Sequence, residues 1–211
     1  MTTGHFRLEP ISPCEWAPAQ NHILLLDASE SMVAPDYPPS RLEAASAACC
    51  GYLAQLLRTR PTSMVAAVCF SSTAHVLCPW SAVRALRDVE TVQVAWLEAC
   101  RAFGLQNTGI GEGLQAGVLL AAARRGPTQV VVLTDGHHNT GVDPLEVAPQ
   151  LKSLATVAVV GIGGSPSDVD EELLRQVASR DSRGRPRYRW IGHRGALLAH
   201  YETLAGGLAR D

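Results

Sequence analysis

The sequence has no long apolar run and few charged residues. No stretch approaches the ~18 consecutive apolar residues of a membrane-spanning helix, and residues 1–7 lack the basic start and apolar core of a secretion signal. Charged residues make up 18% and the net charge is −2, so composition gives no reason to expect nucleic acid or an anionic membrane as a partner. Because 46% of the residues are hydrophobic, we expect a globular cytoplasmic protein. Residues 1–20 are predicted to be an N-terminal extension and residues 21–209 a single domain.

Several chemical signatures are also missing. The six cysteines show no C-x-x-C spacing, so buried reduced thiols are expected rather than a zinc or redox site. There is no nucleophile elbow of the G-x-S-x-G type and no P-loop. Gly161-x-Gly163-Gly164 lacks both the G-K-[ST] ending of a P-loop and the spacing of a dinucleotide-binding turn. These absences predict a protein that is not an enzyme and has no catalytic residues.

Apolar segments alternate with segments of helical periodicity along the chain. The predicted strands are 22–26, 64–70, 73–78, 129–134, 156–162 and 187–191. Helices are predicted at 41–58, at 82–103, from 110 to about 126, after Asp143, after Asp170, and over a last stretch that carries Leu197, Leu198, Tyr201, Leu204 and Leu208. This order predicts an α/β, doubly wound (Rossmann-like), mostly parallel six-stranded sheet with helices on both faces. The tight Ser71-Ser72 link predicts that 73–78 is one antiparallel edge strand.

The first buried strand, 22–26, ends in a pattern of oxygen-bearing side chains. Asp27 is followed by hydroxyls at alternate positions, Asp27-x-Ser29-x-Ser31. A carboxylate and two small neutral oxygen donors suit a hard cation such as Mg²⁺. Since Asp and Ser are also common in turns, the pattern gains value only if other segments supply further ligands.

Two other segments can supply them. The strand 129–134 ends in Asp135, and the loop 106–111 offers Thr108 before a helix. In a doubly wound sheet, ligands bind beyond the carboxyl ends of the strands, where the strand order reverses. If the strands that end in Asp27 and Asp135 are neighbours, all these side chains converge. The predicted metal ligands are Asp27, Ser29, Ser31, Thr108 and Asp135.

This set resembles the metal-ion-dependent adhesion site of von Willebrand factor type A domains. That site combines D-x-S-x-S, a Thr in a loop before a helix, and an Asp before a Gly, as Asp135-Gly136 provides here. The resemblance covers about residues 20–208. In this respect the chain is similar to the stand-alone bacterial type of the domain. Further matching segments are 41–45, the T-D-G-x-x-N pattern at 134–139, 160–163 and 170–174.

The resemblance implies a protein–protein interaction module that holds Mg²⁺ or Mn²⁺ and binds an acidic residue of a partner. It implies that Ser29, Ser31 and either Thr108 or Asp135 contact the ion directly and the other ligands act through water. A partner carboxylate would then complete the octahedral shell, and exchange between Thr108 and Asp135 contacts could shift the final helix. By family analogy, the partner would be an AAA+ ATPase of the MoxR type or a component of a kinase and phosphatase signalling cluster. We expect no membrane or nucleic-acid partner.

Glu30 departs from the family pattern, which often has Gly between the two serines. We expect its side chain to point into solvent. The alternative is that it lies over the ion and competes with an incoming acidic ligand.

Three other interpretations stay open. The protein could be a scaffold that binds independently of metal through an arginine-rich C-terminal surface. It could be a metal-assisted hydrolase with Glu30 or His137 as the base, or His137-His138 could be extra metal ligands, although further zinc ligands are missing. The arginines of that surface are Arg180, Arg183, Arg185, Arg187, Arg189 and Arg194.

Overall fold

The central sheet has the strand order β3-β2-β1-β4-β5-β6. The computed structural model describes residues 19–34, 36–38, 40–86, 90–102 and 107–205. All neighbouring strands are parallel except β3, which runs antiparallel to β2 at one edge. The strands are β1 (Asn21–Asp27), β2 (Met64–Phe70), β3 (Ala74–Ala82), β4 (Thr128–Thr134), β5 (Thr156–Ile162) and β6 (Tyr188–Ile191). The predicted fold class is therefore confirmed.

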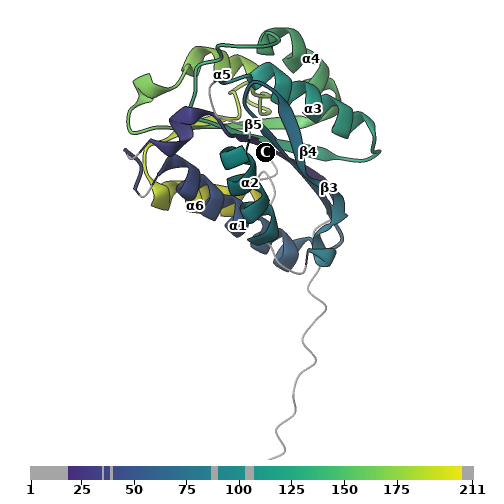
Figure 1. The fold of residues 1–211 in the computed structure, drawn as a ribbon. Helices are drawn as coiled ribbons and strands as arrows, with labels where there is room; N and C mark the ends of the chain where they lie inside the picture. Colours follow the sequence, from purple (N-terminus) through teal and green to yellow (C-terminus); the bar gives the residue numbers. More distant parts are fainter. Residues whose placement is uncertain (1–18, 35, 39, 87–89, 103–106, 206–211) are drawn as a thin grey trace, which may run out of the picture.

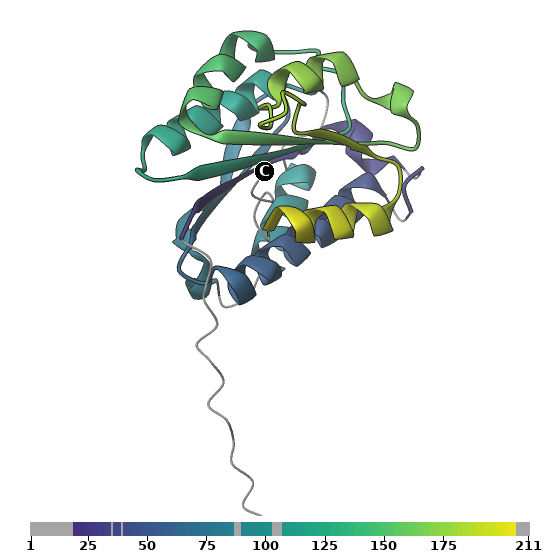
Figure 2. The same cartoon turned by 180° about the vertical axis from the view of Figure 1, so that it is seen from behind.

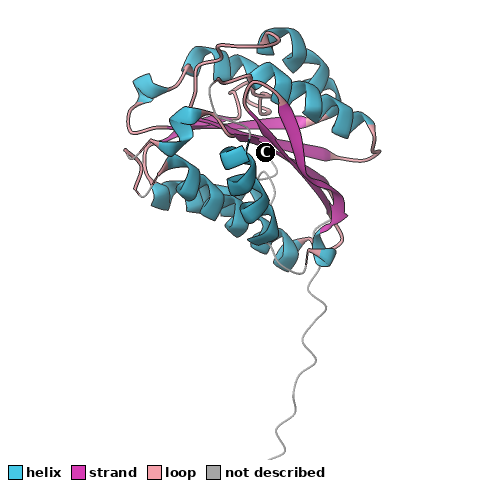
Figure 3. Cartoon of the chain, viewed as in Figure 1, coloured by secondary structure: helices cyan, strands magenta, loops and turns pink. Residues whose placement is uncertain are grey.

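Helices cover both faces of this sheet (Figures 1 and 3). One layer holds α1, α2 and α6, and Figure 2 shows α1 and α6 side by side beneath the sheet. The opposite layer holds α3, α4 and α5. The helices are α1 (Arg41–Thr59), α2 (Glu90–Ala102), α3 (Ile110–Ala122), α4 (Pro144–Leu154), α5 (Glu171–Val177) and α6 (Arg194–Ala205), with short 3₁₀ turns η1 (Glu30–Val33), η2 (Val83–Ala85) and η3 (Pro166–Asp168).

Burial on both faces explains the apolar strands. Every residue of β1 and β4 is buried, because successive side chains point into the two separate helical layers. The chain crosses from β1 to β2 in one direction and from β4 to β6 in the other. The strand order therefore reverses between β1 and β4, which are parallel neighbours with Leu26 opposite Leu133. The sequence analysis predicted a ligand site at a reversal of this kind, and the two strands that end in Asp27 and Asp135 are neighbours there.

The local start signals of two helices are borne out. Ser40 precedes α1, and its side-chain oxygen accepts a hydrogen bond from the Glu43 backbone N–H at 3.1 Å. Asp143 precedes α4, and its carboxylate accepts from the Leu145 N–H at 2.8 Å, with Pro144 as the first helical residue. These caps fix where the two helices begin.

The segment after β2 was predicted wrongly in part. The edge strand runs to Ala82 rather than ending at Cys78, and Ala82 still pairs with Met64 of β2. The 3₁₀ turn η2 follows, so the predicted helix 82–103 is correct only for α2. Pro79 indicated that the strand should end before it, because proline has no N–H for a strand hydrogen bond. An edge strand tolerates such a residue. The predicted end of that helix at Phe103, Leu208 and residues 1–18 lie outside the described residues.

Of the five described cysteines, four are buried and Cys50 is half-buried. Cys49, Cys50, Cys69, Cys78 and Cys100 form no disulfide within the described part of the chain, and Cys14 lies outside it. Burial raises the pKa of the Cys69 thiol to about 11, so this thiol stays protonated at neutral pH. Among the described residues, no helix is both long and apolar enough to cross a bilayer.

Candidate functional site

Five oxygen-bearing side chains lie together at the carboxyl ends of β1 and β4. Four of them are buried and Ser31 is exposed, so the group opens to solvent on one side only. Asp27 ends β1, and Asp135 directly follows β4. We call this group the oxygen cluster: Asp27, Ser29, Ser31, Thr108 and Asp135.

The serine side chains connect the two strand ends. The Ser29 and Ser31 hydroxyl oxygens are 3.1 Å apart, and the Ser31 hydroxyl donates to Asp135 Oδ1 at 2.8 Å. Asp27 Oδ1 accepts from the Ser29 backbone N–H at 2.8 Å, and the Thr134 hydroxyl donates to Asp27 Oδ2. Donors from the loop after β1 and from the last residue of β4 therefore orient the Asp27 carboxylate.

Thr108 reaches the cluster from the loop before α3. Its backbone N–H donates to Asn139 Oδ1 at 2.9 Å, and its carbonyl accepts from the Asn139 N–H at 3.1 Å. Its side chain packs directly against Gly136, where an added Cβ would lie 2.9 Å from Thr108 Oγ1. Only a residue without a side chain leaves this space to Thr108, which explains the Gly after Asp135.

A buried arginine holds the other side of Asp135. Arg41 Nη1 donates to Asp135 Oδ2 at 3.0 Å, while its remaining nitrogens donate to Asp36 and Asp168. Arg41 is only 8% exposed, and the Asp135 side chain is fully buried. One guanidinium therefore contacts three segments: the η1–α1 loop, the residue after β4 and the turn η3.

Both carboxylates of the cluster are buried, and burial disfavours their charged forms. Burial, and then repulsion from Asp135, raises the pKa of Asp27 to about 7. Burial also raises the pKa of Asp135, although the Ser31 hydroxyl and Arg41 oppose this rise. A divalent cation beside both groups would favour their ionised forms.

The geometry fits a small hard cation. Adjacent ligands of an octahedral Mg²⁺ with bonds of ~2.1 Å lie about 3.0 Å apart. The oxygen–oxygen distances of 3.1 Å between Ser29 and Ser31 and 2.8 Å between Ser31 and Asp135 match that spacing. Carboxylate and hydroxyl oxygens are the donors that Mg²⁺ and Mn²⁺ prefer. No group of three or more His, Cys, Asp or Glu suited to a metal occurs within the described ranges.

The residues of the interpretations left open by the sequence differ in exposure. Glu30 is exposed, in agreement with the expected solvent-facing orientation. His137 is exposed and His138 is half-buried. Of the arginine-rich C-terminal surface, all members are exposed except Arg187, which is half-buried.

The sequence missed the residues that support the oxygen cluster. Arg41 is the first residue of α1, where a cation is opposed by the helix dipole. That unfavourable position indicated that Arg41 has acidic partners. In the structure these are Asp36, Asp135 and Asp168. Asn139 belongs to a matched motif, but no sequence rule assigned its bonds to the Thr108 backbone.

All five residues of the oxygen cluster lie inside a recognised family segment. A family model described as the von Willebrand factor type A domain matches residues 22–138. Comparison with curated protein sequences gives no significant match.

Solved structures give the same fold at low identity. BatB from Bacteroides thetaiotaomicron has 21% identity and a TM-score of 0.63, with 88% of this chain and 97% of that chain covered. The SpRpn10 VWA domain has 18% identity and a TM-score of 0.64, with coverage of 91% and 100%. The pilus adhesin SpaC from Lactobacillus rhamnosus GG has 15% identity and a TM-score of 0.71, with coverage of 90% of this chain and 30% of the adhesin. At these identities the likeness concerns the fold alone.

Proposed function

The chain belongs to the von Willebrand factor type A domain family, and from this premise we propose that it is a divalent-metal-dependent protein-interaction module. Members of this family are generally interaction modules, and the structural neighbours are mostly adhesion or interaction domains. The oxygen cluster would hold Mg²⁺ or Mn²⁺, and the partner would supply a carboxylate.

One observation carries the proposal. Side chains from two separate segments, the loop after β1 and the residue after β4, place hydroxyl and carboxylate oxygens 2.8 and 3.1 Å apart, which is the spacing of neighbouring ligands around an octahedral cation. The same sheet edge carries two buried carboxylates, Asp27 and Asp135, whose pKa values are raised by burial. Ser31 is exposed, so one side of the site is open to a ligand from outside. A bound cation supplies positive charge and exchangeable coordination positions at this opening.

The protein residues have separate tasks in this account. Ser29, Ser31 and Thr108 offer neutral donors, so the cation keeps enough charge to attract an acidic side chain. Arg41 occupies Asp135 Oδ2 and leaves Oδ1 directed toward Ser31. Because Arg41 also binds Asp36 and Asp168, the same contacts fix the loops that surround the opening.

Carboxylate recognition can be tested with Mn²⁺, whose bound water speeds the relaxation of solvent protons. We expect acetate, and a peptide with one Asp, to lower this relaxation for the Mn²⁺-loaded protein by displacing water. Propionamide and the matching Asn peptide should leave it unchanged. Equal effects of the Asp and Asn peptides would contradict recognition of a carboxylate.

The same peptide also tests the metal-independent scaffold interpretation. Changing Arg183 and Arg189 to Gln, both exposed on the arginine-rich C-terminal surface, should not alter the response to the Asp peptide. Binding of the Asp peptide that persists with chelator and is lost in this variant would place acidic-ligand binding on that surface instead.

A further inference from the structure

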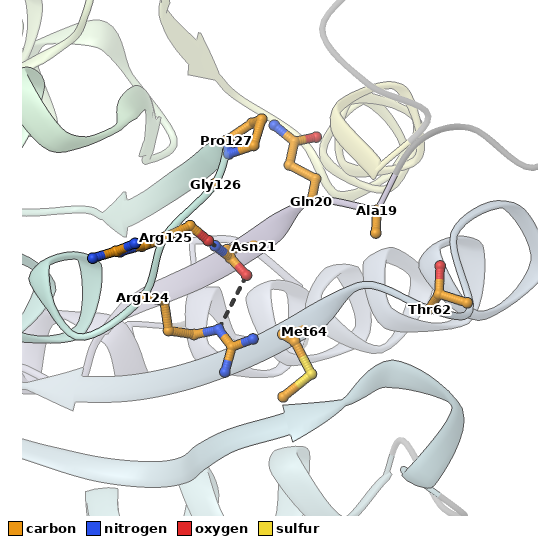
Figure 4. A pocket seen from close by; sticks show the side chains of 9 residues that line it. All are labelled: Ala19, Gln20, Asn21, Thr62, Met64, Arg124, Arg125, Gly126 and Pro127. Carbon is orange, nitrogen blue, oxygen red and sulfur yellow. Dashed lines mark hydrogen bonds between the residues drawn. The ribbon is translucent and has the colours of Figure 1, made fainter.

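A small cavity lies at the opposite end of the sheet from the oxygen cluster. It has a volume of about 200 Å³ and is lined by residues before β1, at the start of β2, and between α3 and β4 (Figure 4). This volume is below the ~300 Å³ at which pockets for whole drug-sized ligands begin. The cavity therefore suits a single chemical group.

Arg124 forms one wall of the cavity and is held in place from two sides. Its Nε donates to Asn21 Oδ1 at 3.2 Å, and its guanidinium stacks 5.3 Å from the centre of the Trp80 ring. Figure 4 shows the side chain directed toward Asn21 and Met64. Arg124 is exposed, and these two contacts orient its guanidinium, which reduces the side-chain freedom that a bound ligand would still remove.

Asn21 is itself fixed, which makes this arrangement rigid. It is 6% exposed, and its amide Nδ2 donates to the Arg125 carbonyl at 3.1 Å and to Thr128 Oγ1 at 3.4 Å. The chain reaches this geometry through Gly126, whose φ of +106° favours glycine. The turn that follows α3 and the first residue of β1 thus form one rigid support for the guanidinium.

The guanidinium has no acidic partner within the described part of the chain. Arg124 makes no ion pair there, and no Asp or Glu lines the cavity. Its two terminal nitrogens form a planar fork that matches the two oxygens of a carboxylate or a phosphate. Thr62 and Gln20 add polar groups at the rim, and Met64 adds an apolar contact.

We propose that this cavity is an anion site that binds a small oxyanion, a carboxylate or a phosphate group, through Arg124. The site shares no residue with the oxygen cluster and does not depend on a metal. It is therefore independent of the function proposed above.

Two neighbouring arginines supply a matched pair for the test. Arg124→Gln removes the fixed guanidinium, whereas Arg125→Gln makes the same change in charge at a side chain that Figure 4 shows directed away from Asn21. Inorganic phosphate and acetate are titrated separately into the full chain, with chelator present and chloride adjusted to constant ionic strength. Binding is followed by the ¹H–¹⁵N signals of the arginine side chains and by calorimetry.

We expect one of the two anions to bind saturably to the wild-type protein and to Arg125→Gln, with affinity for Arg124→Gln at least about 10-fold lower. Tighter binding of phosphate or of acetate then identifies the ligand class. If Arg124→Gln fails to fold, Arg124→Lys replaces it, because Lys keeps the charge but lacks the planar fork. Absence of saturable binding by both anions, or equal binding by both glutamine variants, would overturn the proposal.

Discussion

At the scale of single residues, the members of the oxygen cluster were predictable as a candidate set and the residues that support them were not. Asp27, Ser29, Ser31, Thr108 and Asp135 follow from strand ends and a recognised spacing, and the structure brings all of them together. The contacts of Arg41 with Asp135 and Asp168 join residues that are 94 and 127 positions apart in the sequence, which no local pattern encodes. Pairing of this kind becomes visible only when the fold is known.

Gly136→Ala tests whether Thr108 is part of the metal site. The added Cβ would lie 2.9 Å from Thr108 Oγ1 and must displace that side chain. We expect affinity for Mn²⁺, measured by calorimetry, to fall about 10-fold, as for loss of a residue that orients a ligand. Gly51→Ala is the control, because a Cβ there meets no atom within 4 Å. Unchanged affinity in Gly136→Ala would remove Thr108 from the ligand set.

Arg41→Gln tests the charge balance around Asp135. Because the change leaves a buried carboxylate without its cation, we expect the free energy of unfolding in urea to fall by about 3 kcal/mol. The exposed Arg175–Glu171 pair is the control, and Arg175→Gln should cost less than about 1 kcal/mol. Equal losses in the two variants would show that Arg41 contributes no more than a surface ion pair.

At the scale of elements, periodicity predicted the buried strands and capped helices well. It failed where tertiary pairing overrides composition, as at 79–82, where the chain continues as edge strand β3 past a proline. The sequence also gave no sign that a polar contact joins β1 to α1. His22 Nδ1 and the Tyr52 hydroxyl are 2.8 Å apart in the interior, and Tyr52 packs edge-on against Tyr201 of α6.

This buried histidine predicts loss of stability in acid. Burial, and then the positive charge of Arg60, lowers the pKa of His22 to about 3 from 6.5. The unfolded chain therefore binds one more proton than the folded protein between these values, so stability falls as pH drops below 6.5. From pH 6.5 to pH 5 this group accounts for about 2 kcal/mol.

The contribution can be isolated by mutation. We expect His22→Gln to lose about 2 kcal/mol less than wild type between pH 7.5 and pH 5 in urea unfolding. His193→Gln, at an exposed histidine, should follow the wild-type curve. Parallel curves for His22→Gln and wild type would show that His22 is not kept neutral by burial.

At the scale of the whole molecule, the fold creates the site by reversing the strand order. Two apolar layers on either side of the sheet fix β1 beside β4, and this pairing brings Asp27 and Asp135 to one edge. The alternation of strands and helices predicted that architecture, because buried parallel strands need helices on both faces. The same sheet carries the Arg124 cavity at its other end, which no sequence motif indicated.

The most direct test of the central claim is titration of the chelator-treated protein with Mn²⁺, followed by calorimetry and by electron paramagnetic resonance. The account predicts one bound ion per chain and affinity at least about 10-fold lower in Ser31→Ala. Ser72→Ala, at an exposed serine after β2, should bind like wild type. Ser31 is exposed, so its removal leaves no buried cavity, although it takes one hydrogen-bond donor from Asp135. Absence of a saturable site, or equal affinity in the two serine variants, would contradict a metal centre at the oxygen cluster.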